Sequence, residues 1–345
     1  MKKWLRNPLV WLGLGVVGVL FVYPYYQRIF APNVHTPEGK PTEFFIHTGS
    51  DYRVVGQELL DAGFISDPEA FHWVAEQMNF PRHVYPGRYL LEDGMTTREL
   101  VTLLRSGKQT PMKFTFVKFR TKEQLAEYTA SHLEMNAQEL LDVMANAEFL
   151  KKHNGLTPET ALTIFIPNTY ELYWNISAKD FFERMFKEYK AFWNEERNEK
   201  RKKWRLSRLE VMTLASIVEE ETNKNDEKQQ VAGVYLNRLR KKWPLQADPT
   251  VKYAVGDFAI RRVLNKHLQV DSPYNTYLYP GLPPAPICTP SITSIDAVLN
   301  GEKHQYMYFC ARIDGSGYHQ FSETSAQHEA YARKYRQMLN DRGIR

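Results

Sequence analysis

Three consecutive glutamates, Glu219 to Glu221, end a segment that has the pattern of a helix. Ser207 is a suitable N-cap, and Glu210 three residues later completes a capping box. The apolar residues cluster on one side, so Glu220 is predicted to point away from that side and Glu219 and Glu221 to lie on its two flanks. A half-buried carboxyl on a flank retains its proton and suits general acid catalysis, whereas an exposed one is an ordinary acidic helix end. Periodicity does not separate Glu219 from Glu221.

Two later segments carry side chains of the kind that bind sugars. Asp248-Pro249-Thr250 indicates a turn that caps the next segment. Residues 272–287 hold five prolines and three tyrosines, which predicts an ordered loop. Its hydroxyl and amide groups suit hydrogen bonds to sugar hydroxyls, with rings stacking below, and simple packing on the core is the alternative. Near the C-terminus the pattern predicts a strand, a hairpin at Gly315 and Gly317, a return strand and a helix.

Other chemistries lack their motifs. The sequence contains no Gly-x-Ser-x-Gly elbow, P-loop or His-Glu-x-x-His. Its two cysteines, Cys288 and Cys310, exclude a disulfide scaffold and a multi-cysteine metal site, and their pairing stays open. His319 and His328 are read as hydrogen-bonding residues, so neither a metal nor a cofactor is predicted. A net charge of +5 over 345 residues is too diffuse to indicate nucleic acid.

The N-terminus predicts a membrane anchor. Three basic residues precede an apolar run from about Leu9 to Val22, and Trp and Tyr side chains flank it. The run is shorter than the roughly 20 residues of a spanning helix, but aromatic flanks extend the usable length. No small-x-small cleavage site follows, which favours an uncleaved anchor over a signal peptide. We predict a cytoplasmic tip and a single transmembrane anchor over residues 1–30, with residues 31–345 outside the cytoplasm.

The remainder divides into two parts of an α+β protein. Residues 31–42 form a polar, proline-containing linker. Residues 43–110 predict a small β-α-α-β-α module, with strands at Phe44 to His47 and Arg88 to Leu91. A larger mixed domain follows over residues 111–345. It starts with a strand-turn-helix-helix pattern, and the charge run at 194–208 within it is interpreted as a solvated helix or loop.

Several motifs, in order, resemble the YceG-like endolytic murein transglycosylases, the membrane-bound lytic transglycosylase G type. The resemblance covers essentially the whole chain and implies an N-terminal anchor, a LysM-like module at 43–110 and a YceG-like catalytic domain at 111–345. The motifs are Phe165–Tyr170, Ala215–Thr222, Leu245–Thr250, Ser272–Tyr277, Gly281–Ile287, Tyr308–Phe309 and His319–Ser322.

The resemblance implies cleavage of the MurNAc-β-1,4-GlcNAc bond within nascent peptidoglycan strands, without water, to give 1,6-anhydroMurNAc ends and to terminate glycan elongation. It assigns the catalytic carboxyl to Glu219, which protonates the glycosidic oxygen and then accepts the proton of the muramic 6-hydroxyl. Glu221 matches a supporting or rival acid. The usual pair of carboxylates is not required, because the substrate supplies the nucleophile. The implied substrate-binding residues are Gln246, Asp248, Thr250, Ser272, Tyr274, Asn275, Thr276, Tyr277, His319 and Phe321.

The sequence departs from the family pattern in three places. Glu220 stands where the family usually has a basic residue, Asn168 where it often has Asp, and Phe119-Arg120 where Glu-Gly is more usual. Two alternatives remain: a hydrolytic muramidase that uses Asp248 as second carboxylate, and a catalytically silent wall-binding scaffold. The expected partners are peptidoglycan strands, the membrane and peptidoglycan synthases, with no nucleic acid. The expected location is the inner (cytoplasmic) membrane, with the catalytic domain on the periplasmic side.

Overall fold

The computed structural model describes residues 8–260 and 262–341. About half of them lie in helices, and the described strands form three two-stranded sheets, which confirms a mixed α+β protein. The chain divides into two compact units, and it passes between them more than once. The first unit is Met1–Lys113 with Glu171–Ile176, and the second is Phe114–Tyr170 with Ser177–Arg345.

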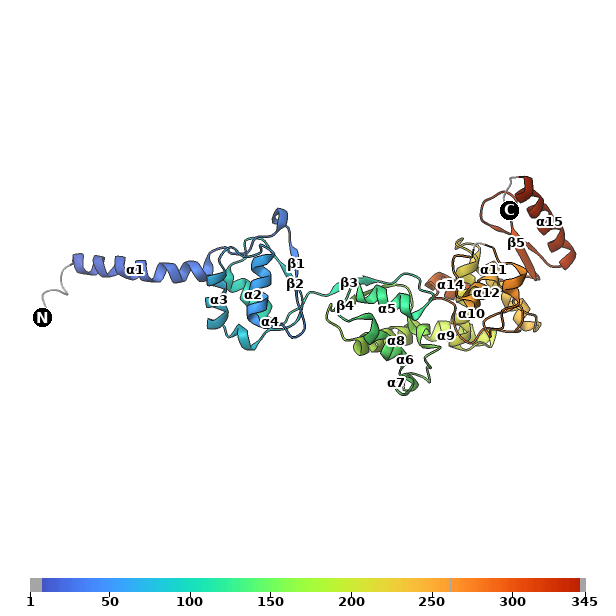
Figure 1. Cartoon of the computed structure of the whole chain (residues 1–345), viewed down its shortest axis with the longest axis horizontal. Helices are drawn as coiled ribbons and strands as arrows, with labels where there is room; N and C mark the ends of the chain where they lie inside the picture. Colours follow the sequence, from blue (N-terminus) through green and yellow to red (C-terminus); the bar gives the residue numbers. More distant parts are fainter. Residues whose placement is uncertain (1–7, 261, 342–345) are drawn as a thin grey trace. The chain divides into compact units, whose positions relative to one another are not determined.

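The first unit is a small sheet covered by helices (Figure 1). β1 (Thr42–Ile46) pairs antiparallel with β2 (Gly87–Leu91). Thr96 and Glu99 form a capping box that starts the last helix, and Gly107 ends it with a φ of 66°. These elements confirm the predicted strand-helix-helix-strand-helix order, while the LysM-like character and the module boundaries stay predictions. The helices are α2 (Tyr52–Asp61), α3 (Pro68–Gln77) and α4 (Thr97–Ser106), with short 3₁₀ helices at Pro37–Gly39 and Phe80–Arg82.

The first unit begins with a long helix, α1 (Pro8–Phe30). Its C-terminal part packs against α3, where the ring centroids of Tyr25 and Trp73 are 5.6 Å apart. Within the described residues, no helix combines the length and the apolar character that crossing a membrane requires. The anchor over residues 1–30 stays a prediction. The basic residues that precede it, Lys2, Lys3 and Arg6, lie outside the described part of the chain.

The core of the second unit forms around α10 (Arg208–Glu221). Every residue from Val211 to Val218 is buried, and the helix packs against α11 (Lys228–Arg240) and α14 (Ile292–Leu299). The Ser207–Glu210 capping box is confirmed, with Ser207 Oγ accepting from the Glu210 amide at 3.1 Å. The boundary between the two units falls within β3 (Met112–Thr115) and again within β4 (Thr169–Leu172). The remaining elements of the second unit ahead of the hairpin are α5 (Lys122–Ala130), α6 (Ala137–Ala145), α7 (Ala147–Lys151), a 3₁₀ helix (Ala161–Ile164), α8 (Ala178–Phe192), α9 (Glu195–Trp204), α12 (Asp248–Val255) and α13 (Asn265–Leu268).

A hairpin and a helix complete the second unit (Figure 1). β5 (Tyr308–Ala311) pairs antiparallel with β6 (His319–Ser322), so Ala311 lies opposite His319. Gly315 and Gly317 take φ values of 72° and 77° in the connection, as the predicted hairpin requires. α15 (Ser325–Asp341) packs on both strands. The predicted strand-hairpin-strand-helix order is therefore confirmed.

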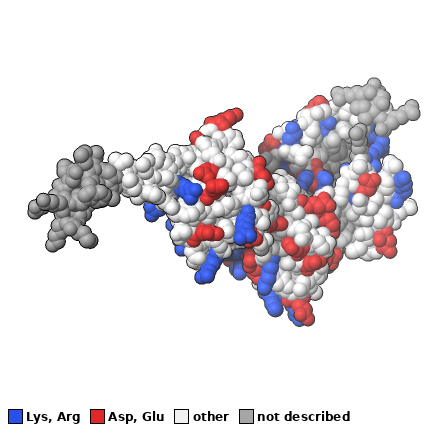
Figure 2. Space-filling model, turned by 60° about the vertical axis from the view of Figure 1, so that its left-hand side comes forward, with Lys and Arg blue, Asp and Glu red and all other residues white. Residues whose placement is uncertain are grey.

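The charge run at 194–208 forms a solvated helix, as predicted. α9 contains no buried residue and carries exposed ion pairs between Lys200 and Glu196 (2.6 Å) and between Lys202 and Glu199 (2.8 Å). On the face drawn in Figure 2, Lys and Arg are interspersed with Asp and Glu rather than gathered into one field.

Glu220 ties the end of α10 to the loop after β3. Lys118 Nζ lies 2.9 Å from its carboxylate, and Arg120 donates to both oxygens, at 3.2 Å from Nε and 2.8 Å from Nη2. Burial acts to raise the pKa of Glu220, but these hydrogen bonds outweigh burial and lower the pKa. The side chain is only 13% exposed. Its position opposite the apolar side therefore does not leave it in water, because the loop covers it.

This ion pair joins two of the departures from the family pattern, the acid at position 220 and the arginine at position 120. Reversing one charge alone, with Arg120→Glu, places two carboxylates together, and we expect it to lower the free energy of unfolding by about 1–3 kcal/mol. Adding Glu220→Arg should recover part of that loss, which urea unfolding of the single and double variants measures. If the two single losses simply add in the double variant, the pair contributes nothing.

Candidate active site

The carboxylate of Glu219 is held in a closed network. Lys228 Nζ lies 3.0 Å from Glu219 Oε2, and the hydroxyls of Ser291 and Ser294 donate to the same oxygen. The Lys228 side chain is 4% exposed and that of Glu219 is 15% exposed. Burial acts to raise the pKa of Glu219, but the hydroxyl and ammonium groups outweigh burial and lower the pKa. Glu219 is therefore an ionised carboxylate that ties α10 to α11 and α14.

Glu221 lies two residues further along in different surroundings. Its carboxyl accepts a hydrogen bond from Tyr235 Oη at 2.6 Å. Burial raises the pKa of Glu221 to about 7, and the nearby carboxylate of Asp248 adds to the effect, while the Tyr235 hydrogen bond and the charge of Arg238 oppose it. A carboxyl with this pKa carries a proton near neutral pH and donates it readily, which is the property of a general acid.

Glu221 lines a cavity of about 350 Å³ in the second unit. The size falls within the usual range for ligand sites. The Arg238 side chain forms part of the cavity wall. It donates to the backbone carbonyls of Met307 (2.7 Å) and Leu245 (2.5 Å), and these bonds fix α11 to the start of the hairpin and to the segment before α12. The lining consists of Glu221, Tyr235, Arg238, Gln246, Asp248, Tyr277, Tyr308, Phe309, Cys310, Ala311, His319 and His328.

The structure brings part of the predicted site together in this cavity. Gln246, Asp248, Tyr277 and His319 line it with Glu221, and Glu219 is not among the lining residues. Tyr277 Oη donates to Asp248 Oδ1 at 2.6 Å, which fixes the Asp248 carboxylate. Burial raises the pKa of Tyr277, and this hydrogen bond adds to the effect.

The other predicted binding residues support the loops and do not line the cavity. Thr250 and Thr276 are buried and share a hydrogen bond of 2.8 Å. Asn275 is fully buried, and its amide donates to the carbonyls of Leu268 and Val270, both at 2.9 Å. The remaining three have similar local roles: Ser272 accepts from the Tyr274 amide (3.3 Å), Tyr274 Oη donates to Glu159 (3.2 Å), and Phe321 is packed in the hairpin core at 8% exposure.

His319 is oriented by a second buried carboxylate. Glu227, whose side chain is 4% exposed, lies 2.8 Å from His319 Nδ1 and accepts from the His319 amide at 2.6 Å. Thr222 Oγ1, at the end of α10, donates to the same Glu227 at 3.2 Å. Because Nδ1 is engaged by Glu227, Nε2 is the ring nitrogen that remains to contact a ligand.

Sequence reasoning missed several lining residues. Tyr235 and Arg238 lie three residues apart on α11, at and just after its apolar stretch Val231–Leu236, and that spacing was an available signal. His328 comes from α15, and its ring stacks on Tyr308 at 5.3 Å. No short-range pattern links it to the site. Cys310 also lines the cavity, and it and Cys288 are both free thiols. In the described part of the chain, no cluster of three or more His, Cys, Asp or Glu could hold a metal ion.

Comparisons with known proteins agree on one family. The model of the YceG-like family matches residues 44–334. The chain is 28% identical over 342 residues to an endolytic murein transglycosylase of Bacillus subtilis (strain 168), covering 95% of this chain and 93% of that protein. A protein of the same name from Streptococcus pneumoniae serotype 2 (strain D39) is 26% identical, over 91% of this chain and 62% of that protein. The crystal structure of a YceG-like protein from Listeria monocytogenes superposes with a TM-score of 0.55 at 29% identity, covering 85% of this chain and 99% of that one. Since the family match spans most of its length, this chain belongs to the YceG-like family.

Proposed function

We propose that this protein is an endolytic lytic transglycosylase of peptidoglycan, with Glu221 as its general acid. The observation that carries the proposal is a half-buried carboxyl of pKa about 7 facing a cavity with Gln246, Asp248, Tyr277 and His319. The relatives named endolytic murein transglycosylases support the choice of substrate. Glu219, to which the family resemblance assigned the acid, is less suited because its pKa is lowered and its oxygen is occupied by Lys228 and two serines.

The proposed reaction needs no water. The Glu221 carboxyl gives its proton to the oxygen between MurNAc and GlcNAc as the C1–O bond breaks. The muramic 6-hydroxyl then bonds to C1 and closes the 1,6-anhydro ring, and its proton returns to the Glu221 carboxylate. Glu221 therefore ends the reaction protonated, as it began. His319, held by Glu227, and the Tyr277–Asp248 pair would position the two sugars on either side of the acid.

One observation favours a second candidate. Asp248 shares the cavity with Glu221 and is close enough to raise its pKa. A pair of carboxyls of this kind is what a hydrolytic muramidase uses. The two reactions differ in their products, because hydrolysis leaves reducing MurNAc ends and transglycosylation leaves 1,6-anhydroMurNAc ends.

We further propose that the enzyme acts outside the cytoplasm, anchored in the inner (cytoplasmic) membrane through residues 1–30. Residues 43–110 would act as a LysM-like glycan-binding module joined by the linker at 31–42, and residues 111–345 as the catalytic domain. Internal cuts in nascent strands would end their elongation, and peptidoglycan synthases are the expected partners. The basic and apolar pattern of the N-terminus and the peptidoglycan activity named for the relatives support this placement.

The catalytic assignment predicts different outcomes at positions 219 and 221. Glu221→Gln removes the proton donor, so we expect cleavage of uncross-linked glycan strands to fall by about 10²–10⁴-fold. Glu219→Gln weakens the Lys228 network, so we expect it to reduce stability while retaining most of the cleavage rate of the folded protein. Mass spectrometry of the digests gives both the rate and the ends formed.

Loss of cleavage in folded Glu219→Gln alone would return the acid to position 219. Reducing ends would identify a hydrolase. Full activity in both variants would exclude both assignments, and absence of cleavage by the wild-type chain, with glycan still bound, would favour a wall-binding scaffold.

The raised pKa of Glu221 also predicts how stability depends on pH. In the unfolded chain this carboxyl ionises near pH 4.3, whereas the folded protein keeps its proton up to about pH 7. Folding therefore loses stability as pH rises from about 4 to 7, and Gln at this position avoids the loss. Urea unfolding should show Glu221→Gln more stable than wild type by about 1–3 kcal/mol at pH 8 and equal to it at pH 4. An equal difference at both pH values would mean that Glu221 titrates normally.

The anchor makes a separate prediction. Full-length protein expressed in bacteria should stay in the membrane fraction after washing with alkaline carbonate, because only a hydrophobic insertion resists that treatment. Protease added to spheroplasts should degrade the region after residue 30. Release by carbonate, or protection from the protease, would contradict the proposed anchor and orientation.

A further inference from the structure

A second and larger cavity lies on another face of α11. It has a volume of about 1090 Å³ and is formed by the C-terminal ends of α9 and α11, the first half of α10, and the loops at Gly281–Pro284 and Leu299–Lys303. Tyr235 and Arg238 line the cavity of Glu221, whereas their neighbours Leu236 and Leu239 line this one. The two cavities are therefore separated by α11, and the proposed reaction does not use the second.

The charges around this second cavity are nearly all positive. Among its described lining residues the one acid is Glu210, whose carboxylate accepts from the backbone amide of Ser207 in the capping box at 2.6 Å. Within the described residues, Lys203, Arg205 and Lys303 form no ion pair. The cations that line the cavity are Lys200, Lys203, Arg205, Arg240 and Lys303.

Solvation of surface cations and the helix dipoles explain only part of the positive charge that lines this cavity. α9 and α11 both end here, and their terminal carbonyls attract cations such as Lys203 and Arg240. That effect does not account for Lys303, which lies in a loop, or for the apolar walls between the cations. The walls are built from Trp204, Leu206, Leu209, Leu236, Leu239, Leu282, Pro283, Pro284 and Leu299.

One buried group in the cavity lacks a partner. Thr213 lines it and is 1% exposed, yet its Oγ1 makes no hydrogen bond among the described residues. A buried hydroxyl without a partner costs about 1–3 kcal/mol. Nearby, the indole of Trp204 is fixed by a hydrogen bond from Nε1 to the Leu299 carbonyl at 3.2 Å, so the apolar wall is held in place.

We propose that this cavity binds an acidic peptide segment of a partner protein, one in which carboxylates alternate with apolar side chains. The cations would pair with the carboxylates, the leucine, proline and tryptophan walls would cover the apolar side chains, and Thr213 Oγ1 would bond to the peptide backbone. The volume lies at the upper end of the roughly 300–1,000 Å³ of ordinary ligand sites, which leaves room for a short stretch of chain. The proposal does not depend on the reaction proposed for the first cavity.

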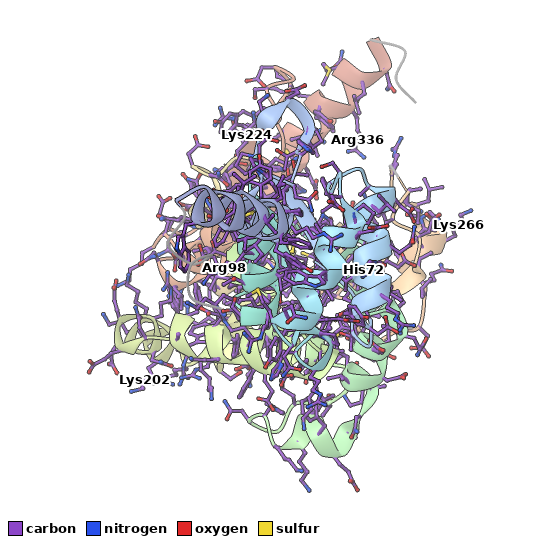
Figure 3. The ribbon with its side chains drawn as sticks, turned by 90° about the vertical axis from the view of Figure 1, so that its left-hand side faces the viewer. His72, Arg98, Lys202, Lys224, Lys266 and Arg336 are labelled. Carbon is purple, nitrogen blue, oxygen red and sulfur yellow. The ribbon has the colours of Figure 1, made fainter. Side chains whose placement is uncertain are left out.

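The test measures binding of fluorescent hexapeptides to the full-length chain in detergent by fluorescence anisotropy. One pool is randomised among Glu, Asp, Leu, Phe and Ser, and a control pool carries Lys and Arg in place of Glu and Asp. Members of the acidic pool should bind, and the double substitution Lys203→Glu with Lys303→Glu should weaken their binding at least tenfold. Lys202→Glu is the matched control, because Lys202 lies on the outer side of α9 (Figure 3), is 61% exposed and does not line the cavity. It should leave binding unchanged.

Thr213→Val separates binding from folding. It replaces the unpaired hydroxyl by a methyl group of the same shape, so thermal stability should stay equal or rise while peptide affinity falls about tenfold. Lower stability with unchanged affinity would mean that the hydroxyl serves the fold alone.

The proposal is overturned if the acidic pool does not bind, if the Lys202 variant weakens binding equally, or if the basic pool binds equally well. Binding of phosphatidylglycerol vesicles that is lost in the Lys203 and Lys303 variant, without peptide binding, would identify the surface as a lipid contact and would also overturn it. Glycan cleavage should be unchanged in all these variants, which keeps failure here distinct from failure of the proposed reaction.

Discussion

The burial of α10 is the constraint on which the site depends. Because residues 211–218 are enclosed on every side, the last turn of the helix brings three carboxyls into protein rather than into water. A buried carboxylate is costly unless a cation or several donors compensate it. Glu219 has Lys228 and two serines, and Glu220 has Lys118 and Arg120. Glu221 has the phenol of Tyr235, which is insufficient compensation, so it retains its proton to about pH 7.

The remaining elements set what surrounds that proton. Glu227 joins the turn between α10 and α11 to the hairpin, because it binds both Thr222 and His319. Thr250 and Thr276 hold the start of α12 against the loop that carries Tyr277. The cavity walls are thus fixed by buried hydrogen bonds, and the polar groups facing the acid are held in place before any substrate binds, which is the preorganisation that catalysis requires.

Sequence reasoning predicted local features well and long-range ones poorly. The Ser207 cap, the C-terminal hairpin and the strand order of the first unit follow from neighbouring residues, and each is confirmed. Helical periodicity placed Glu219 and Glu221 on opposite flanks but could not reveal their partners. Ser291 lies 72 positions away from Glu219, and only the fold brings it there. Similarly, Asn275 and Thr276 look like binding residues by type. In the fold the Asn275 amide donates to the Leu268 carbonyl, and the Thr276 hydroxyl accepts from the Ala247 amide.

The Asp248 carboxylate affects both the pKa of Glu221 and the proposed reaction. Its carboxylate is fixed by Tyr277 and raises the pKa of Glu221, so the same negative charge that favours a protonated acid is present when the sugar ring becomes positively charged. Glycosidic cleavage passes through an oxocarbenium-like transition state, which a fixed negative charge stabilises. In transglycosylation, Asp248 then needs neither to activate water nor to attack C1, because the substrate's own 6-hydroxyl closes the ring. The Glu221–Asp248 pair is therefore compatible with a reaction in which one carboxyl moves protons and the other only provides charge.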